Sequence, residues 1–283
     1  MREVPVLTPF MLPLLGLIVT FGLGWLGAMR MAKLETARGM IDKREGSLVA
    51  DGAQGVLGFI GGASAFLIGV LMLASVGHFN ATSEVANEEA IAYSAAFQNS
   101  VALPDPARQI VQRDLVCLMR SVSTDSWHAA TTGDLTGDRN SNAWRAKTVS
   151  DLGTFAVASG GSSDALDAVA SEVRDAAKLG QKRLLSGEST LPLALWALLY
   201  LSLLVLTFLM TLMMRSYPLL LALCIGATFT VSAGMICVLV AFAEPFDTDT
   251  GVYISPQALE AVLISSQESQ PGAAWDPCER LSP

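Results

Sequence analysis

Four stretches of this 283-residue chain lack any charged side chain: Val4–Met29, Gly52–Ser83, Ser189–Met214 and Ser216–Ala243. A helix needs roughly 20 predominantly apolar residues to cross a hydrocarbon core of about 30 Å, and buried helices of soluble proteins rarely run that long without a charge. The composition agrees, with 52% apolar and only 16% charged residues. The pattern predicts an all-α integral membrane protein with four transmembrane helices.

The residues that build most catalytic and metal centres are also scarce. The two histidines, His78 and His128, have no metal-binding spacing, and the four cysteines form no Cys-x-x-Cys pair. The sequence contains no nucleophile elbow, phosphate-binding glycine loop, dinucleotide fingerprint or carboxylate pair with a defined partner. We therefore expect neither an enzyme nor a bound cofactor.

An excess of positive charge is missing as well, because 18 Lys and Arg stand against 26 Asp and Glu and the net charge is −8. Such a chain repels a phosphate backbone, which excludes nucleic acid as a partner. The predicted spans carry no Asp, Glu, His or Arg at membrane depth, whereas proton-coupled pumps and transporters usually do. A channel needs none, since small side chains can line a pore and apolar side chains can gate it by dewetting.

The spans divide the chain into eight segments. The predicted boundaries are 1–29 for the N-terminus and first span, 30–54 for a basic loop, 55–77 for the second span, 78–190 for a helical soluble domain, 191–214 for the third span, 215–218 for a turn, 219–243 for the fourth span and 244–283 for a C-terminal tail. The soluble domain is thus inserted between the second and third spans.

Apolar residues recur at helical spacing through this domain, and helix continues into it from the second span. Pro104 and Pro106 predict a turn, because the residue before a proline avoids the α region. A second helix follows over Ala107–Ser121, and a further helix over Asp164–Leu185 has Ser162 or Ser163 as its N-terminal cap. These helices predict a small bundle.

Short loops rich in Lys and Arg stay in the cytoplasm, whereas long segments cross the membrane largely regardless of charge. Arg30, Lys33, Arg38, Lys43 and Arg44 crowd the first loop. We therefore expect a multi-pass cell-membrane protein with both termini and the 78–190 domain on the extracytoplasmic side. Cys117 and Cys278 share that side, where a disulfide between them is possible, although their proximity is not encoded in the spacing.

Two segments carry a family resemblance. One runs from Phe79 through Ala90 and continues with Leu103-Pro104, Arg108, Arg113 and Trp127, and the other runs from Glu244 through Gly251 and continues with Ile254 to Leu259. In this order, and at these distances from four spans, they resemble the bestrophin-like membrane domain family of bacterial four-span proteins. The resemblance covers nearly the whole chain from the first span to about Leu263.

Bestrophins proper are anion channels assembled as rings of subunits, with a pore lined by the second span. The resemblance therefore implies a homo-oligomer in the lipid bilayer that passes small anions. It also implies a middle domain in the cytoplasm, which conflicts with the orientation predicted from the basic loop. Bestrophins carry a Pro-Phe-Gly-acidic segment after the last span that binds calcium in some members, and here Pro245-Phe246-Asp247-Thr248-Asp249 lacks the glycine and the run of acids.

On this hypothesis we expect the pore or its constriction to be formed by Gly58, Phe59, Gly62, Phe66 and Gly69. Four of them share one helical face, and Phe59 lies one step off it. Asp247 and Asp249 are the candidate metal site, and a solvated helix stop after Pro245 is the alternative interpretation. The rival function is a non-conducting membrane scaffold or sensor whose helical domain binds a partner.

Overall fold

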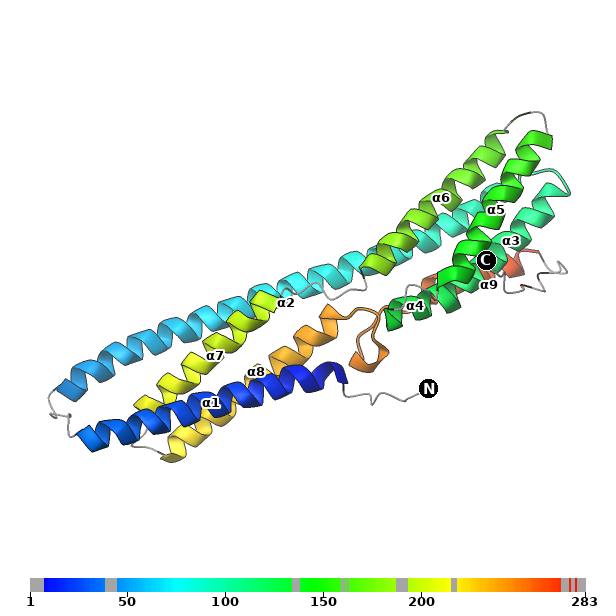
Figure 1. Ribbon diagram of the computed structural model, residues 1–283. Coiled ribbons are helices and arrows are strands. Elements are labelled where there is room, and N and C mark those ends of the chain that lie inside the picture. The colour runs from blue at the N-terminus through cyan, green and yellow to red at the C-terminus, as the bar shows by residue number, and fades with distance from the viewer. Residues whose placement is uncertain are drawn as a thin grey trace. The chain divides into compact units, whose positions relative to one another are not determined.

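The chain folds almost entirely into helices. A computed structural model describes residues 8–38, 45–133, 138–158, 161, 163–186, 193–214, 218–270, 275 and 278. Its elements are α1 (Thr8–Arg38), α2 (Glu45–Ser100), α3 (Ala107–Ser121), a π-helical turn (Val122–Ser126), α4 (Trp127–Thr132), α5 (Arg139–Ala158), α6 (Asp164–Leu185), α7 (Leu193–Met213), α8 (Pro218–Ala243), a 3-10 turn (Thr248–Thr250) and α9 (Gln257–Glu268) (Figure 1). The described part of the chain contains no strand, so the predicted all-α class is confirmed.

Four of these helices are long and apolar enough to cross a membrane. The stretches that meet these criteria are Phe10–Arg30, Gly58–Ser100, Leu193–Met213 and Leu219–Ala243. The second has 43 residues, about twice what a crossing needs, so only part of it has to lie in the membrane. The predicted number of spans is therefore confirmed. The second span belongs to a helix of 56 residues that continues without a break into the following domain, as the sequence led us to expect.

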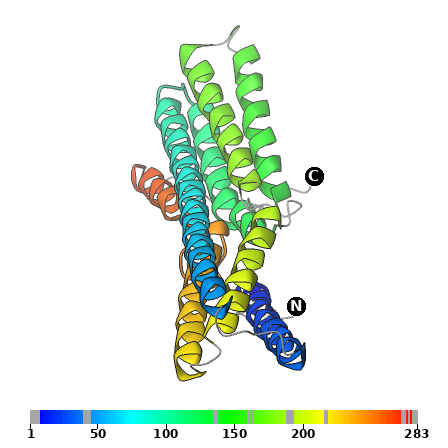
Figure 2. The ribbon, with the colours of Figure 1, turned by 90° about the vertical axis from the view of Figure 1, so that its left-hand side faces the viewer.

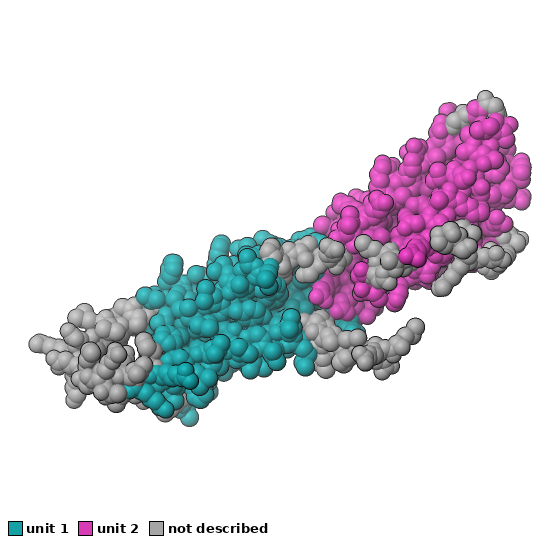
Figure 3. All heavy atoms as spheres, in the orientation of Figure 1, with its two compact units in different colours: residues 1–78, 190–243, 249–251 teal, residues 79–189, 244–248, 252–283 magenta. Residues whose placement is uncertain are grey.

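The chain divides into two compact units (Figure 3). Unit 1 comprises residues 1–78, 190–243 and 249–251, and unit 2 comprises residues 79–189, 244–248 and 252–283. The boundary between the two units falls within α2, so its residues up to His78 belong to unit 1 and those from Phe79 on belong to unit 2.

In unit 1 the membrane helices share an apolar core. Its buried members are Leu17, Phe21, Ile68, Leu199, Leu203, Ile236 and Val240. Gly24 sets the approach of α1 to α7, because a Cβ at this position would lie 3.0 Å from the backbone oxygen of Leu204 and 3.1 Å from Cβ of Thr207. Small residues commonly permit such close contact between membrane helices.

Unit 2 is a helical bundle with a separate core. Figures 1 and 2 both show α5 and α6, in green, running side by side. Tyr93 and Phe97 of α2, Leu115 of α3 and Val173 of α6 are among its buried residues. The structure confirms the predicted bounds of α3 and α6, and Ser163 is the cap of α6, since its hydroxyl accepts a hydrogen bond of 3.3 Å from the backbone N–H of Leu166.

Candidate functional site

The transmembrane part of α2 has one packed face and one open face. Ser64, Ile68, Leu71 and Ser75 are buried within unit 1. The five predicted pore residues all lie on the exposed side of the helix. The packed face therefore holds α2 to the other helices of unit 1, and the opposite face is exposed among the described residues.

The open face combines small residues with two large aromatic ones. Phe59 is 77% exposed and Phe66 is 74% exposed, although apolar side chains of this size are usually buried. A Cβ on Gly58, Gly62 or Gly69 would find no atom within 4 Å. A face of this kind can line a pore, contact another protein chain or face lipid.

The segment after α8 is bound into unit 2 by aromatic and backbone contacts. Phe246 is buried, and its ring meets the ring of Trp127 edge to face with the centroids 6.0 Å apart. Trp127 Nε1 donates a hydrogen bond of 3.2 Å to the backbone oxygen of Ile254, whose own N–H donates to the oxygen of Pro245 at 2.7 Å. The Pro245-Phe246 step thus has a structural role in closing the loop before α9.

The acidic residues of this segment form no evident metal cluster. Asp247 belongs to unit 2 and Asp249 to unit 1, and among the described residues no group of three or more His, Cys, Asp and Glu could hold a metal ion. Burial is the main cause, and the charge of the neighbouring Asp247 the second, of a raised pKa at the Glu244 carboxyl. A cation site at Asp247 and Asp249 therefore stays a prediction.

Unit 2 also contains a buried ionic cluster. Arg183 of α6 is 0% exposed, and its Nε donates a hydrogen bond of 2.7 Å to Oε2 of Glu89 on α2. Arg183 Nη2 donates to Ser126 Oγ at 2.9 Å, and the guanidinium carbon lies 4.1 Å from the centroid of the Trp127 ring.

Sequence reasoning missed this cluster, although one signal was available. Val85, Glu89 and Tyr93 are spaced by four residues and lie on the same helical stripe, so the carboxylate stands between two buried residues. A buried carboxylate needs a partner of opposite charge, but nothing local in the sequence points to Arg183, 94 residues away.

Comparison with protein families identifies the family of this chain. The Bestrophin-like domain matches residues 37–259, which is most of the chain. The chain belongs to the bestrophin-like family. The predicted resemblance is confirmed.

Solved structures support the same fold for this bestrophin-like protein. A point mutant of a bacterial bestrophin homologue from Klebsiella pneumoniae is 15% identical and superimposes with a TM-score of 0.58, covering 93% of this chain and 98% of its own. A structure described as a membrane protein mutant is 14% identical, with a TM-score of 0.59 and coverages of 93% and 96%. At this identity the likeness shows the fold alone. No curated protein matches the chain.

A disulfide joins the C-terminal tail of the bestrophin-like protein to its helical bundle. It links Cys117 of α3 to Cys278, with the two Cα atoms 5.3 Å apart. Trp275 of the tail also packs on the ring of Phe97 of α2, with centroids 6.2 Å apart. The structure thus realises the pairing that the sequence left open, and it fixes the tail to the core of unit 2.

Proposed function

We propose that this bestrophin-like membrane protein is an oligomeric anion channel whose pore is lined by the open face of α2. The observation that carries the proposal is the contrast between the two faces of this helix. One face is packed in unit 1, whereas Gly58, Phe59, Gly62, Phe66 and Gly69 on the other are exposed. Family membership supports the same assignment.

One copy of α2 cannot enclose a pore, so the proposal requires several copies arranged around a common axis. The glycines then widen the pore at their level, while Phe59 and Phe66 form apolar rings that close it by dewetting. The edge of an aromatic ring carries partial positive charge, which favours a small anion over a cation if the edges face the axis. No catalytic step forms part of this function.

Flux through liposomes tests the proposal. The purified full chain is reconstituted, and chloride and potassium gradients are compared for wild type, Phe66→Ala and Leu201→Ala. Leu201 is a matched control because it is an exposed apolar residue on α7. We expect chloride flux that Phe66→Ala alters by at least severalfold and Leu201→Ala leaves unchanged. Conduction that is identical in all three proteins would remove Phe66 from the pore.

The rival function, a non-conducting scaffold or sensor, is favoured by the independent core of unit 2 and by its buried Arg183–Glu89 pair. A domain with its own core can bind a partner without any pore. Absence of flux from a well-folded oligomer would select this alternative.

We further propose that unit 2 faces the extracytoplasmic side. Disulfides persist in oxidising compartments and are rare in the cytosol, and both cysteines of the Cys117–Cys278 bond belong to unit 2. The basic first loop supports the same orientation independently. The chain would then be oriented opposite to the topology that the bestrophin resemblance implied.

A further inference from the structure

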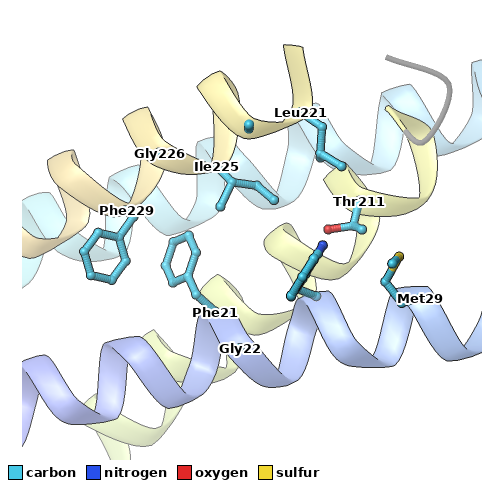
Figure 4. A pocket seen from close by; sticks show the side chains of 10 residues that line it. Phe21, Gly22, Met29, Thr211, Leu221, Ile225, Gly226 and Phe229 are labelled. Atoms are coloured by element: carbon cyan, nitrogen blue, oxygen red, sulfur yellow. The ribbon is translucent and has the colours of Figure 1, made fainter. Parts of the chain in front are cut away.

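Unit 1 contains an apolar groove that the channel proposal does not use. It has a volume of about 710 Å³ and lies between α1 and α8, with Thr211 of α7 at its edge (Figure 4). Phe21, Gly22, Trp25 and Met29 line it from α1, and α8 contributes residues between Leu221 and Phe229. Gly22 and Gly226 leave it open, because a Cβ on either would meet no atom within 4 Å.

The length of the groove matches one leaflet of a bilayer. Phe21 and Met29 are eight residues apart, which at a rise of 1.5 Å per residue is about 12 Å. Half of the hydrocarbon core is about 15 Å. Met29 lies at the end of the span Phe10–Arg30 and Phe21 lies near its middle, so the groove runs from the membrane surface to the bilayer centre.

The groove is closed at the bilayer centre and charged at its other end. The rings of Phe21 and Phe229 meet edge to face there, with centroids 5.3 Å apart. At the surface, Arg30 follows Met29 directly, and Lys33 lies one helical turn beyond Met29 on the same face. Both basic side chains are exposed. A helix of a second copy would need a groove across both leaflets, whereas an acyl chain with an anionic headgroup fits this one.

We propose that this groove binds one acyl chain of an anionic phospholipid from the leaflet on the side of the basic first loop, with Lys33 and Arg30 holding the headgroup phosphate. Basic residues at the end of an intramembrane pocket are a recurring means of recognising anionic lipids. The site depends neither on ion conduction nor on the orientation of the chain.

Native mass spectrometry of the full chain in detergent, titrated with phosphatidylglycerol and separately with phosphatidylcholine, tests the proposal. Gly226→Leu fills the groove, and Gly234→Leu is its matched control, because Gly234 is an equally open glycine of α8 outside the groove. We expect Gly226→Leu to weaken phosphatidylglycerol binding about tenfold and Gly234→Leu to leave it unchanged. Lys33→Gln should reduce the preference for phosphatidylglycerol over phosphatidylcholine about fivefold.

Two results would overturn the proposal. Equal lipid binding by the Gly226→Leu and Gly234→Leu proteins would show that lipid does not occupy the groove. A change of subunit number in Gly226→Leu, with lipid binding intact, would make the groove a contact between copies of the chain.

Discussion

Arg183 and Glu89 form an ion pair that is shielded from solvent, with the guanidinium Nε 2.7 Å from the carboxylate Oε2 and the two side chains 0% and 1% exposed. The pair joins α6 to α2 inside unit 2. Because neither charge can be rehydrated in place, each depends on the other for its stability.

Removing one partner should therefore destabilise unit 2 strongly. We expect Arg183→Met to lower the free energy of unfolding by about 3–5 kcal/mol, because it leaves the Glu89 charge buried without a counter-ion. The thermal unfolding midpoint of the purified protein measures this. Lys178→Ala is the control, since Lys178 and Asp175 form a pair of the same length, 2.7 Å, with side chains that are 76% and 51% exposed; it should cost less than about 1 kcal/mol. Equal losses in the two variants would contradict the prediction.

The same cluster explains why position 180 is glycine. A Cβ there would lie 2.7 Å from Glu89 Oε1 and 3.3 Å from Arg145 Nη2. Gly180→Ala should therefore destabilise the protein by about 1–3 kcal/mol, although alanine is the better helix former. Gly153→Ala in α5, where a Cβ meets nothing within 4 Å, should stabilise it by up to about 1 kcal/mol. A stabilising Gly180→Ala would show that Glu89 can move aside freely.

Local signals predicted much of the fold. Charge-free runs gave the four spans, the prolines at 104 and 106 gave the start of α3, and the hydroxyl of Ser163 gave the start of α6. Partners far apart in the chain could not be deduced in this way. Glu89 and Arg183 are 94 residues apart, and Cys117 and Cys278 are 161 apart, so their pairing depends on the packed bundle.

The candidate site was predictable only up to the face of a helix. Spacing placed Gly58, Gly62 and Phe66 on one side of α2, and the structure shows that side exposed. A pore would require copies of the chain to assemble around this face, and side-chain spacing within one chain does not encode assembly.

The Cys117–Cys278 bond gives a test of membrane orientation. In a Cys224→Ala/Cys237→Ala background, which removes the other two cysteines, Cys117→Ser leaves Cys278 as the single thiol. We expect a membrane-impermeant maleimide to label it in intact cells. In a variant that lacks all four native cysteines, the single thiol of Lys33→Cys should be labelled only after the cells are permeabilised. The reverse pattern would place unit 2 in the cytoplasm.

The same Cys117→Ser substitution should also weaken the fold. Loss of the bond restores conformational freedom to the unfolded chain, and about 2–4 kcal/mol is typical of such a loss. Reducing agent should lower the unfolding midpoint of wild type and leave that of Cys117→Ser unchanged. Insensitivity of both proteins to reductant would show that the bond contributes nothing to stability.

Asp114 of α3 predicts a dependence of stability on pH. Its carboxylate is buried, and Lys147 Nζ lies 2.6 Å from it and 2.8 Å from Asp151. Arg113 also faces it, at 3.7 Å. Burial first, and then hydrogen bonding with Asp151, raises the pKa of Asp114 to about 6, against the opposing effect of Lys147.

The sign of the effect follows from proton binding. Between pH 4 and 6 the folded protein holds a proton on Asp114 that the unfolded chain has already lost, so stability falls as the pH rises through this window. Burial acts to raise the pKa of the Asp151 carboxyl, but its hydrogen bonds with Asp114 and Lys147 outweigh burial and lower that pKa. Asp151 therefore makes stability rise with pH, but only at pH values below the ordinary pKa of an aspartate. The amide in Asp114→Asn does not titrate, so this variant should lose most of the decline, which amounts to at most about 3 kcal/mol in wild type. Thermal unfolding midpoints of wild type and Asp114→Asn at pH 4.5, 5.5 and 6.5 would reveal this difference. Parallel pH profiles of the two proteins would assign the decline to another group. Glu244, whose carboxyl pKa is also raised, is the first such group to test.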